Sequence, residues 1–220
     1  MPRRRRPPAS PDPQIALAQY RRRAAVYDLE LAPLEPIRRR AGEAVGLRPG
    51  DTVLDLGCGT GLSLPLLQAA VGPRGHIVGV ELSPQMLERA RQRVERHGWR
   101  NVRLHNTPVA QAPLDSQADA ALLHFTHDIL QDDAALRHIV AHLRPGGRIV
   151  ASGLKWAPRR SGLLNLLVIP AALHSVSSLD GLDRPWRRLS ALIGEPELHS
   201  LLGGTVYLAR WRRPDRAANR

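Results

Sequence analysis

Two carboxylates and three glycines stand in this 220-residue chain at a spacing that could do chemistry. Asp55 lies in the apolar run "VLDL", and Gly57, Gly59 and Gly61 follow it at alternate positions. Glu81 ends the next apolar run, "HIVGVE". A strand that ends in a glycine-rich turn before a helix lets a ligand touch the main chain, because no Cβ atom intervenes. We therefore predict that a nucleotide-like ligand binds at this turn.

The glycine spacing and the charge of Asp55 distinguish two classes of ligand. A dinucleotide site is typical of G-x-G-x-x-G, whereas this chain has G-x-G-x-G and places Leu62 where the third dinucleotide glycine would stand. A carboxylate beside two phosphates would be repulsive, but one beside a sulfonium-bearing amino acid is attractive. The pattern favours S-adenosylmethionine (SAM), with Glu81 accepting hydrogen bonds from both ribose hydroxyls.

These residues need a sheet to bring them together, and the hydrophobic pattern predicts one. We expect strands over 52–56, 76–80, 101–105, 118–124 and 148–153, and helices over 14–28, 34–45, 62–71, 84–97, 132–143, 161–178 and 184–193. Two further strands flank Gly203 and Gly204. Strands that alternate with helices indicate a parallel sheet covered on both faces. We therefore predict an α/β, Rossmann-like fold with a seven-stranded, mostly parallel sheet and a C-terminal antiparallel hairpin.

The composition suggests how the chain is divided and where it works. We expect a disordered basic tail over 1–13, a helical lid over 14–48, the ligand-binding domain over 49–212 and a basic tail over 213–220. No apolar run is long enough to span a membrane, and no secretory signal follows the basic N-terminus. The one cysteine excludes an intramolecular disulfide. These features predict a cytoplasmic protein.

The formal net charge of +12 invites a nucleic-acid interpretation. Lys155 is the only lysine among the 32 basic residues, and the arginines are dispersed along the chain. This composition is typical of GC-rich coding, which raises the charge without any partner. We therefore expect no nucleic-acid partner. The nine histidines show no metal-ligand spacing, so we also expect no metal.

Four segments together resemble a known family. "VLDLGCGTG", "GVELSPQML", "ADAALLH" and "LRPGGRIV" occur in this order between about residues 50 and 153. With them the chain resembles the class I SAM-dependent methyltransferases. It is most similar in appearance to the ubiquinone/menaquinone C-methylase-like and small bacterial phosphatidylethanolamine N-methyltransferase-like group. "YRRRAAVYDL", which begins at Tyr20, is similar to a lid segment of such enzymes.

The resemblance implies a set of cofactor-binding residues. These are Tyr27, Asp55, Gly57, Cys58, Gly59, Gly61, Glu81, Leu82, Met86, Asn106, Thr107 and His124. Asp55 and the glycines would line the methionine and ribose part of SAM, and Leu82 and Met86 would lie near the adenine. Asn106 stands where the family usually has an aspartate for the adenine amino group, and an amide oxygen can accept the same N–H. His124 would lie under the methyl donor, and Tyr20 or Tyr27 would close the site.

Candidate catalytic residues follow the fourth expected strand. Methyl transfer needs alignment, exclusion of water and, for some acceptors, removal of a proton. In "HFTHDIL", His127 is the candidate base and Asp128 its orienter, although both could instead serve helix capping and packing. Lys155 and Trp156 follow the fifth strand, where Lys155 could bind an anionic acceptor or lie incidentally on the surface.

Three functions agree with these residues. The first is transfer of a methyl group from SAM to a small-molecule or lipid-like acceptor. The apolar segment 161–178 could face that acceptor or a membrane surface, and core packing explains it equally well. The second is RNA or protein methylation, although "HFTH" replaces the D/N-P-P-Y element that grips a base amino group, and no RNA-binding module is evident. The third is a non-catalytic SAM-binding protein.

Overall fold

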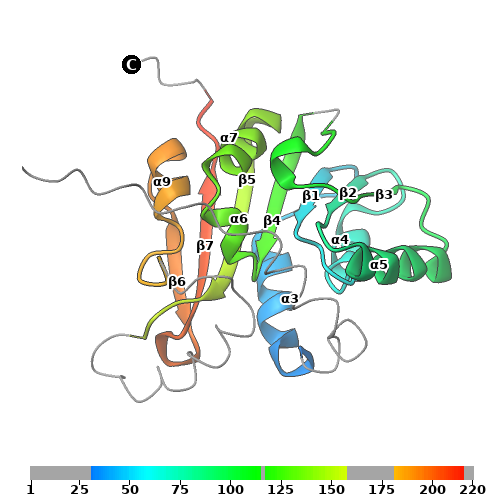
Figure 1. Ribbon diagram of the computed structural model, residues 1–220. Coiled ribbons are helices and arrows are strands. Elements are labelled where there is room, and N and C mark those ends of the chain that lie inside the picture. Colours follow the sequence, from blue (N-terminus) through cyan, green and yellow to red (C-terminus); the bar gives the residue numbers. More distant parts are fainter. Residues whose placement is uncertain (1–30, 115–116, 158–180, 216–220) are drawn as a thin grey trace, which may run out of the picture.

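The computed structural model describes residues 31–114, 117–157 and 181–215, which build one sheet with helices on both faces (Figure 1). The sheet has seven strands in the order β3-β2-β1-β4-β5-β7-β6. The strands are β1 (Thr52–Leu56), β2 (His76–Val80), β3 (Val102–His105), β4 (Ala118–His124), β5 (Leu143–Leu154), β6 (Glu197–Leu201) and β7 (Val206–Arg212). β1 to β5 pair in parallel, and β7 is antiparallel to both β5 and β6. The predicted fold class is confirmed.

The described helices precede β1 or lie between strands, and all of them except the short α6 match a predicted helix. They are α3 (Glu35–Ala44), α4 (Leu64–Val71), α5 (Pro84–His97), α6 (His127–Leu130), α7 (Asp133–His142) and α9 (Arg187–Ile193), with single 3₁₀ turns η1 (Ala32–Leu34), η2 (Val109–Gln111) and η4 (Leu202–Gly204). Local signals explain where α5 begins and ends. At its start the Ser83 hydroxyl accepts a hydrogen bond from the Met86 N–H, and after its last turn Gly98 adopts the left-handed conformation.

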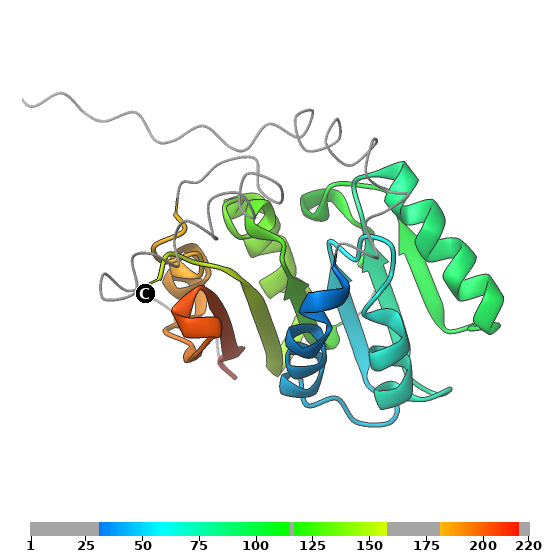
Figure 2. The same cartoon turned by 90° about the horizontal axis from the view of Figure 1, so that it is seen from below.

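The two faces of the sheet carry separate apolar clusters. Val53 and Leu122 pack with residues of α3, α4 and α5 on one face, whereas Leu54 and Leu123 pack with residues of α7 and α9 on the other. Figure 2 shows α3 and α4 on the opposite side of the sheet from α7 and α9. Because side chains alternate along a strand, Asp55 shares a face with Val53. That face is covered by α3.

The strand order reverses between β1 and β4, the two central neighbours. From β1 the chain proceeds to β2 and β3 at one side of the sheet, and from β4 it proceeds to β5 at the other. Open α/β sheets bind ligands in the crevice outside the carboxyl ends of the strands at such a reversal. The segments that follow Leu56 and His124 meet at this point.

Several boundaries differ from the predicted ones by one to five residues, and two of these differences have a local reason. β5 begins at Leu143, ahead of the predicted start at 148, because Leu143 pairs with Ala118 before a register shift. α4 begins at Leu64 because the turn continues through a hydrogen bond from the Leu64 N–H to the Gly61 carbonyl, at 3.1 Å. The expectations for 1–13, 14–28 and 161–178, and for Tyr27, lie outside the described residues.

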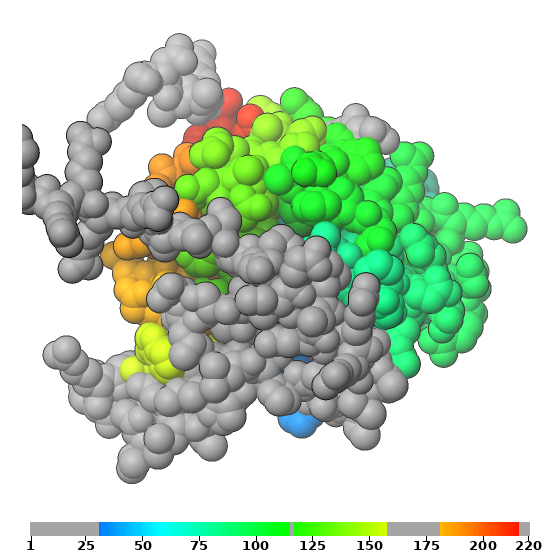
Figure 3. All heavy atoms as spheres, viewed as in Figure 1, coloured from blue at the N-terminus to red at the C-terminus, as the bar shows by residue number. Residues whose placement is uncertain are grey.

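Figure 3 shows one face of the molecule, where the green segments that include α5, α6 and α7 form much of the described surface. Within the described residues no helix combines the length and the apolar character that a membrane crossing requires.

Candidate functional site

The glycine turn follows β1 directly. Gly57, Gly59 and Gly61 have φ angles of 73°, 57° and 77°, which L-residues with a Cβ rarely adopt. A Cβ on Gly57 would lie 2.4 Å from Cγ2 of Thr126, and one on Gly61 would lie 2.7 Å from Cδ1 of Leu64. The folded chain therefore needs these two glycines for its own packing as well as for the approach of a ligand.

Glu81 faces the glycine turn from the end of β2. Its Oε2 accepts a hydrogen bond from the Gly59 N–H at 3.1 Å, and its Oε1 accepts one from the Ser83 N–H at 2.7 Å. Burial raises the pKa of Glu81, and the backbone N–H groups partly oppose that rise. Each carboxylate oxygen has a second lone-pair direction, so the group can still accept hydrogen bonds from a ligand.

Asp55 is a buried carboxylate with an unsatisfied oxygen. Only 2% of its surface is exposed, and within the described part of the chain Oδ2 has no hydrogen-bond partner. Burial raises the pKa of Asp55 to about 7, and Glu81 adds to the rise while Arg38 opposes it. An orphaned carboxylate oxygen is costly in the interior, so Oδ2 marks a position that favours a bound donor or cation.

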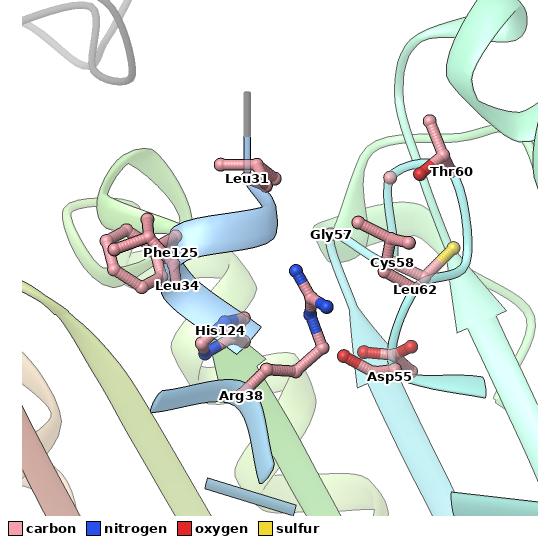
Figure 4. Close-up of a pocket in the computed structure, with 12 residues that line it drawn as sticks. Leu31, Leu34, Arg38, Asp55, Gly57, Cys58, Thr60, Leu62, His124 and Phe125 are labelled. Atoms are coloured by element: carbon pink, nitrogen blue, oxygen red, sulfur yellow. The ribbon is translucent and has the colours of Figure 1, made fainter. Parts of the chain in front are cut away.

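A cavity lies beside Asp55 and the glycine turn, at the carboxyl ends of β1 and β4. Its lining comes from η1 and α3, from the turn after β1 and from the segment after β4, and comprises Leu31, Leu34, Arg38, Asp55, Gly57, Cys58, Gly59, Thr60, Leu62, Ser63, His124 and Phe125. Figure 4 shows most of these side chains around the opening. The structure thus brings together Asp55, the glycines, Cys58 and His124, which the sequence proposed for one ligand.

Arg38 is a lining residue that the sequence analysis missed. It comes from α3, is only 4% exposed and forms an ion pair with Glu35. Figure 4 shows its guanidinium extending into the cavity between His124 and Asp55. The buried positions of α3 are Ile37, Arg38 and Ala41. Helical periodicity from these apolar neighbours would have placed Arg38 on the inner face.

His124 is held at the end of β4 by a neighbouring strand. Its Nδ1 lies 2.7 Å from Oγ of Ser152 in β5, and its ring packs edge-on against Phe125 with centroids 4.8 Å apart. Burial lowers the pKa of His124 to about 3, and the nearby charge of Arg38 adds to the effect. The imidazole is therefore neutral at physiological pH. Phe125 adopts a φ of 57°, a strained value typical of residues at functional sites.

The residues predicted to surround the adenine lie at the ends of β2 and β3. Asn106 donates hydrogen bonds through Nδ2 to the carbonyl oxygens of Glu81 and Leu82, both at 2.9 Å. This arrangement ties the two strand ends together. Met86 is 1% exposed in α5, and Thr107 is partly exposed after β3. Their contacts with adenine stay predictions.

The residues predicted to act on the acceptor are not among those that line this cavity. His127 is 7% exposed at the start of α6, and Asp128 follows it. Lys155 is 8% exposed, so it is buried rather than on the surface, and burial lowers its pKa. The main-chain N–H of Lys155 donates a hydrogen bond to the Thr205 carbonyl at 2.8 Å. The roles of these residues and of Trp156 stay predictions.

The sequence predicts no metal site, and the described residues can be searched for clusters of metal-binding side chains. Among them, no three or more His, Cys, Asp or Glu side chains gather in a group that could hold a metal ion. The expectation for the whole chain stays a prediction.

Comparison with known sequences assigns the central part of the chain to a family. The family described as "Methyltransferase domain" matches residues 53–147. A 37.1 kDa protein of a Streptomyces fradiae transposon is 37% identical over 117 residues, which are 52% of this chain and 33% of that protein. A ubiquinone/menaquinone biosynthesis C-methyltransferase of Methylococcus capsulatus is 31% identical over 126 residues, 51% of this chain and 47% of that protein. The chain therefore spans less than half the length of the curated relatives it matches.

Solved structures extend the likeness over most of the chain. The N-methyltransferase NodS of Bradyrhizobium japonicum, in complex with S-adenosyl-L-homocysteine (SAH), has a TM-score of 0.67 at 20% identity and covers 90% of this chain and 98% of that one. An O-methyltransferase family protein of Burkholderia thailandensis has a TM-score of 0.66 at 18% identity and covers 96% of this chain and 65% of that one. At these identities the likeness shows a shared fold.

The matched segment contains the central residues of the candidate site. Residues 53–147 include β1 with its glycine turn, the end of β2 at Glu81 and the end of β4 at His124. The orphaned Oδ2 of Asp55 and the positive φ angles of the turn fit the cationic, phosphate-free nucleoside that such domains bind. Residues 53–147 thus match a methyltransferase domain, and the chain has the fold of SAM-dependent methyltransferases.

Proposed function

We propose that this protein transfers a methyl group from SAM to a small-molecule or lipid-like acceptor. The observation that carries the proposal is the pair of opposite charges in the cavity beside the glycine turn: Asp55 with its orphaned Oδ2, and Arg38. The methionine end of SAM carries an ammonium, a sulfonium and a carboxylate. The ammonium would bind Asp55 and the carboxylate would bind Arg38.

The rest of the nucleoside would lie along the ends of β1, β2 and β3. Glu81 would accept hydrogen bonds from the ribose hydroxyls while it holds the Gly59 N–H. Leu82, Met86, Asn106 and Thr107 would surround the adenine. In this proposal residues 49–212 form the methyltransferase domain, and 14–48, with Tyr27, covers the bound cofactor.

The chemistry asks this chain for alignment and for exclusion of water. When SAM is bound it supplies an activated methyl group, and its leaving thioether is neutral. Leu31, Leu34 and Phe125 belong to the apolar part of the cavity lining and would keep water from the reacting atoms. For an acceptor that must lose a proton, His127 would be the base and Asp128 its orienter.

The acceptor is proposed from the character of the cavity and its surroundings. The apolar lining suits a small or lipid-like molecule, and Lys155 and Trp156 would contact its polar part. The relatives' names include arsenite methyltransferase and ribosomal protein L11 methyltransferase, so their acceptors differ widely. Arsenite suits a group of soft thiolate ligands, whereas this chain has one cysteine, Cys58, which is buried and has a raised pKa. A cytoplasmic location is part of the proposal.

Two measurements test the proposed function. Isothermal titration calorimetry should show binding of SAM and SAH, and binding of NAD in their place would contradict the proposal. Tritiated methyl from SAM should then enter one fraction of a cell extract divided into lipids, small molecules, RNA and proteins. Label in the lipid or small-molecule fraction supports the proposed acceptor, label in RNA or protein supports the alternative, and absence of label from every fraction favours a SAM-binding protein without catalysis.

A further inference from the structure

The pair formed by His124 and Ser152 carries information about where a proton lies. Ser152 is 1% exposed in the middle of the sheet, and its Oγ lies 2.7 Å from Nδ1 of His124. Within the described residues this is the one hydrogen bond that the Ser152 side chain makes. The two residues are also paired in register, His124 in β4 beside Ser152 in β5.

The hydroxyl proton of Ser152 has one acceptor in this arrangement. A buried hydroxyl whose proton points at no acceptor is unfavourable, because its lost hydration is not compensated. If Nδ1 carried a proton and donated it to Oγ, the hydroxyl proton of Ser152 would have no acceptor among the described residues. If the hydroxyl donates to Nδ1, both buried groups are satisfied by a single bond. The second arrangement is therefore favoured, and it leaves the imidazole proton on Nε2.

The structure assigns Ser152 as a positioning residue that holds His124 in the Nε2–H tautomer, so that His124 presents a hydrogen-bond donor to the cavity. His124 is then a partner for a ligand oxygen and does not remove the acceptor's proton. Its side chain lines the cavity with Arg38, and Figure 4 shows the two side chains near one another. Burial and the charge of Arg38 lower the pKa of His124, which keeps the ring neutral and able to hold one tautomer.

The ligand oxygen has two chemical sources, and both suit an N–H donor beside a guanidinium. One is the carboxylate of the cofactor, and the other is an anionic oxygen of the acceptor. Three carboxylates of the described residues act on this neighbourhood: Asp55 lines the cavity, Glu35 pairs with Arg38, and Glu81 adds to the rise in the pKa of Asp55. The assignment of a ligand oxygen rests on the proposed function, whereas the tautomer rests on the hydrogen bond between His124 and Ser152.

Nuclear magnetic resonance of protein labelled with ¹⁵N at histidine tests the tautomer directly. Two-bond ¹H–¹⁵N correlations distinguish Nδ1–H from Nε2–H imidazoles, and the signals lost in His124→Gln identify the ring among the nine histidines. We expect the wild-type protein at pH 7 to show a neutral Nε2–H ring. Ser152→Ala should lose that preference, and Ser152→Thr, which restores the hydroxyl, should regain it. A proton on Nδ1 in the wild type, or an unchanged tautomer in Ser152→Ala, would overturn the assignment.

Binding measurements then distinguish the two sources of oxygen. The probes are SAH and its decarboxylated analogue, titrated into the wild type and Ser152→Ala. If the cofactor carboxylate is the partner, Ser152→Ala weakens SAH about 2- to 10-fold and leaves the analogue unchanged. Equal affinity of SAH for both proteins, together with the expected tautomer, assigns the donor to the acceptor's oxygen. A protein that binds neither probe contradicts the proposed function but not the tautomer.

Discussion

The carboxylate of Glu81 accepts a hydrogen bond from the main-chain N–H of Gly59, at 3.1 Å, across 22 positions of the sequence. The side chain that we propose as the ribose ligand therefore also holds the glycine turn at the end of β1. Removing the carboxylate should affect both the ligand and the turn that receives it, and the two effects can be separated.

Glu81→Ala should weaken SAH binding by about 1–3 kcal/mol, because it removes a charged hydrogen-bond acceptor from a buried position. Glu81→Gln keeps an oxygen that can accept the Gly59 N–H, so it should preserve the melting temperature better than Glu81→Ala while still weakening SAH. Calorimetry and thermal melts measure the two effects. Glu88→Ala, an exposed change on α5, is the matched control. Unchanged SAH affinity in Glu81→Ala would remove the ribose role.

Arg38 should decide how well the protein distinguishes ligands with a carboxylate from those without one. Arg38→Met should weaken SAH about 10- to 100-fold, the loss expected for a charge-assisted hydrogen bond, and should leave 5′-methylthioadenosine, which has no amino acid part, nearly unchanged. Arg39→Met is the control, because Arg39 pairs with the same Glu35 but its side chain is 65% exposed. Equal losses for both ligands would indicate general damage to the cavity instead of a lost carboxylate contact.

Asp55 should make SAH binding and stability depend on pH in opposite ways. Folding raises its pKa from 3.8 to about 7, so the folded chain holds this proton more tightly than the unfolded chain. The stability that this group contributes is therefore fully present below about pH 4 and is lost as the pH rises through about 7. The ammonium of SAH binds the ionised form of the Asp55 carboxylate. The affinity of the protein for SAH should therefore increase as the pH rises through about 7.

Thermal melts and titrations between pH 5.5 and 8.5 check both slopes in the wild type and in two variants. In Asp55→Asn, the contribution of this carboxyl to the pH dependence of the melting temperature and of the SAH affinity should disappear. Asp183→Asn, an exposed change, should keep both pH dependences. An SAH affinity in the wild type that does not rise with pH would argue against contact between Asp55 and the ammonium.

Gly57→Ala should destabilise the protein even without a ligand. The φ of 73° costs about 1–2 kcal/mol for a residue with a Cβ, and the contact at 2.4 Å with Cγ2 of Thr126 adds about 1–3 kcal/mol of overpacking. Thr126→Ser removes that methyl group, so the double variant should recover the second part. Gly46→Ala is the control for φ alone, because its φ is 65° and nothing lies within 4 Å of an added Cβ. Chemical denaturation measures the wild type, the two single variants Gly57→Ala and Thr126→Ser, the double variant and Gly46→Ala. Additive losses in the double variant would contradict the clash.

The sequence by itself determined the order of strands and helices and the cofactor turn. Short apolar runs that close on glycine are local signals, so β1, β2 and β4 begin and end where the pattern predicts. Asp55, Glu81 and the three glycines can also be recognised from the sequence alone. They stand at the ends of two predicted strands, and the alternation of strands and helices already predicts that these strands belong to one parallel sheet.

Only the tertiary structure decided which side chains complete the cavity. Arg38 enters from a helix outside the matched segment. Helical periodicity could place it on the inner face of α3, but only the packing of α3 against the sheet brings its guanidinium to Asp55 and His124. The partner of His124 is Ser152, 28 positions later, and it depends on the register of β4 against β5. Long-range contacts of this kind follow from packing and strand pairing, whereas local sequence patterns report only the conformation of the segment that carries them.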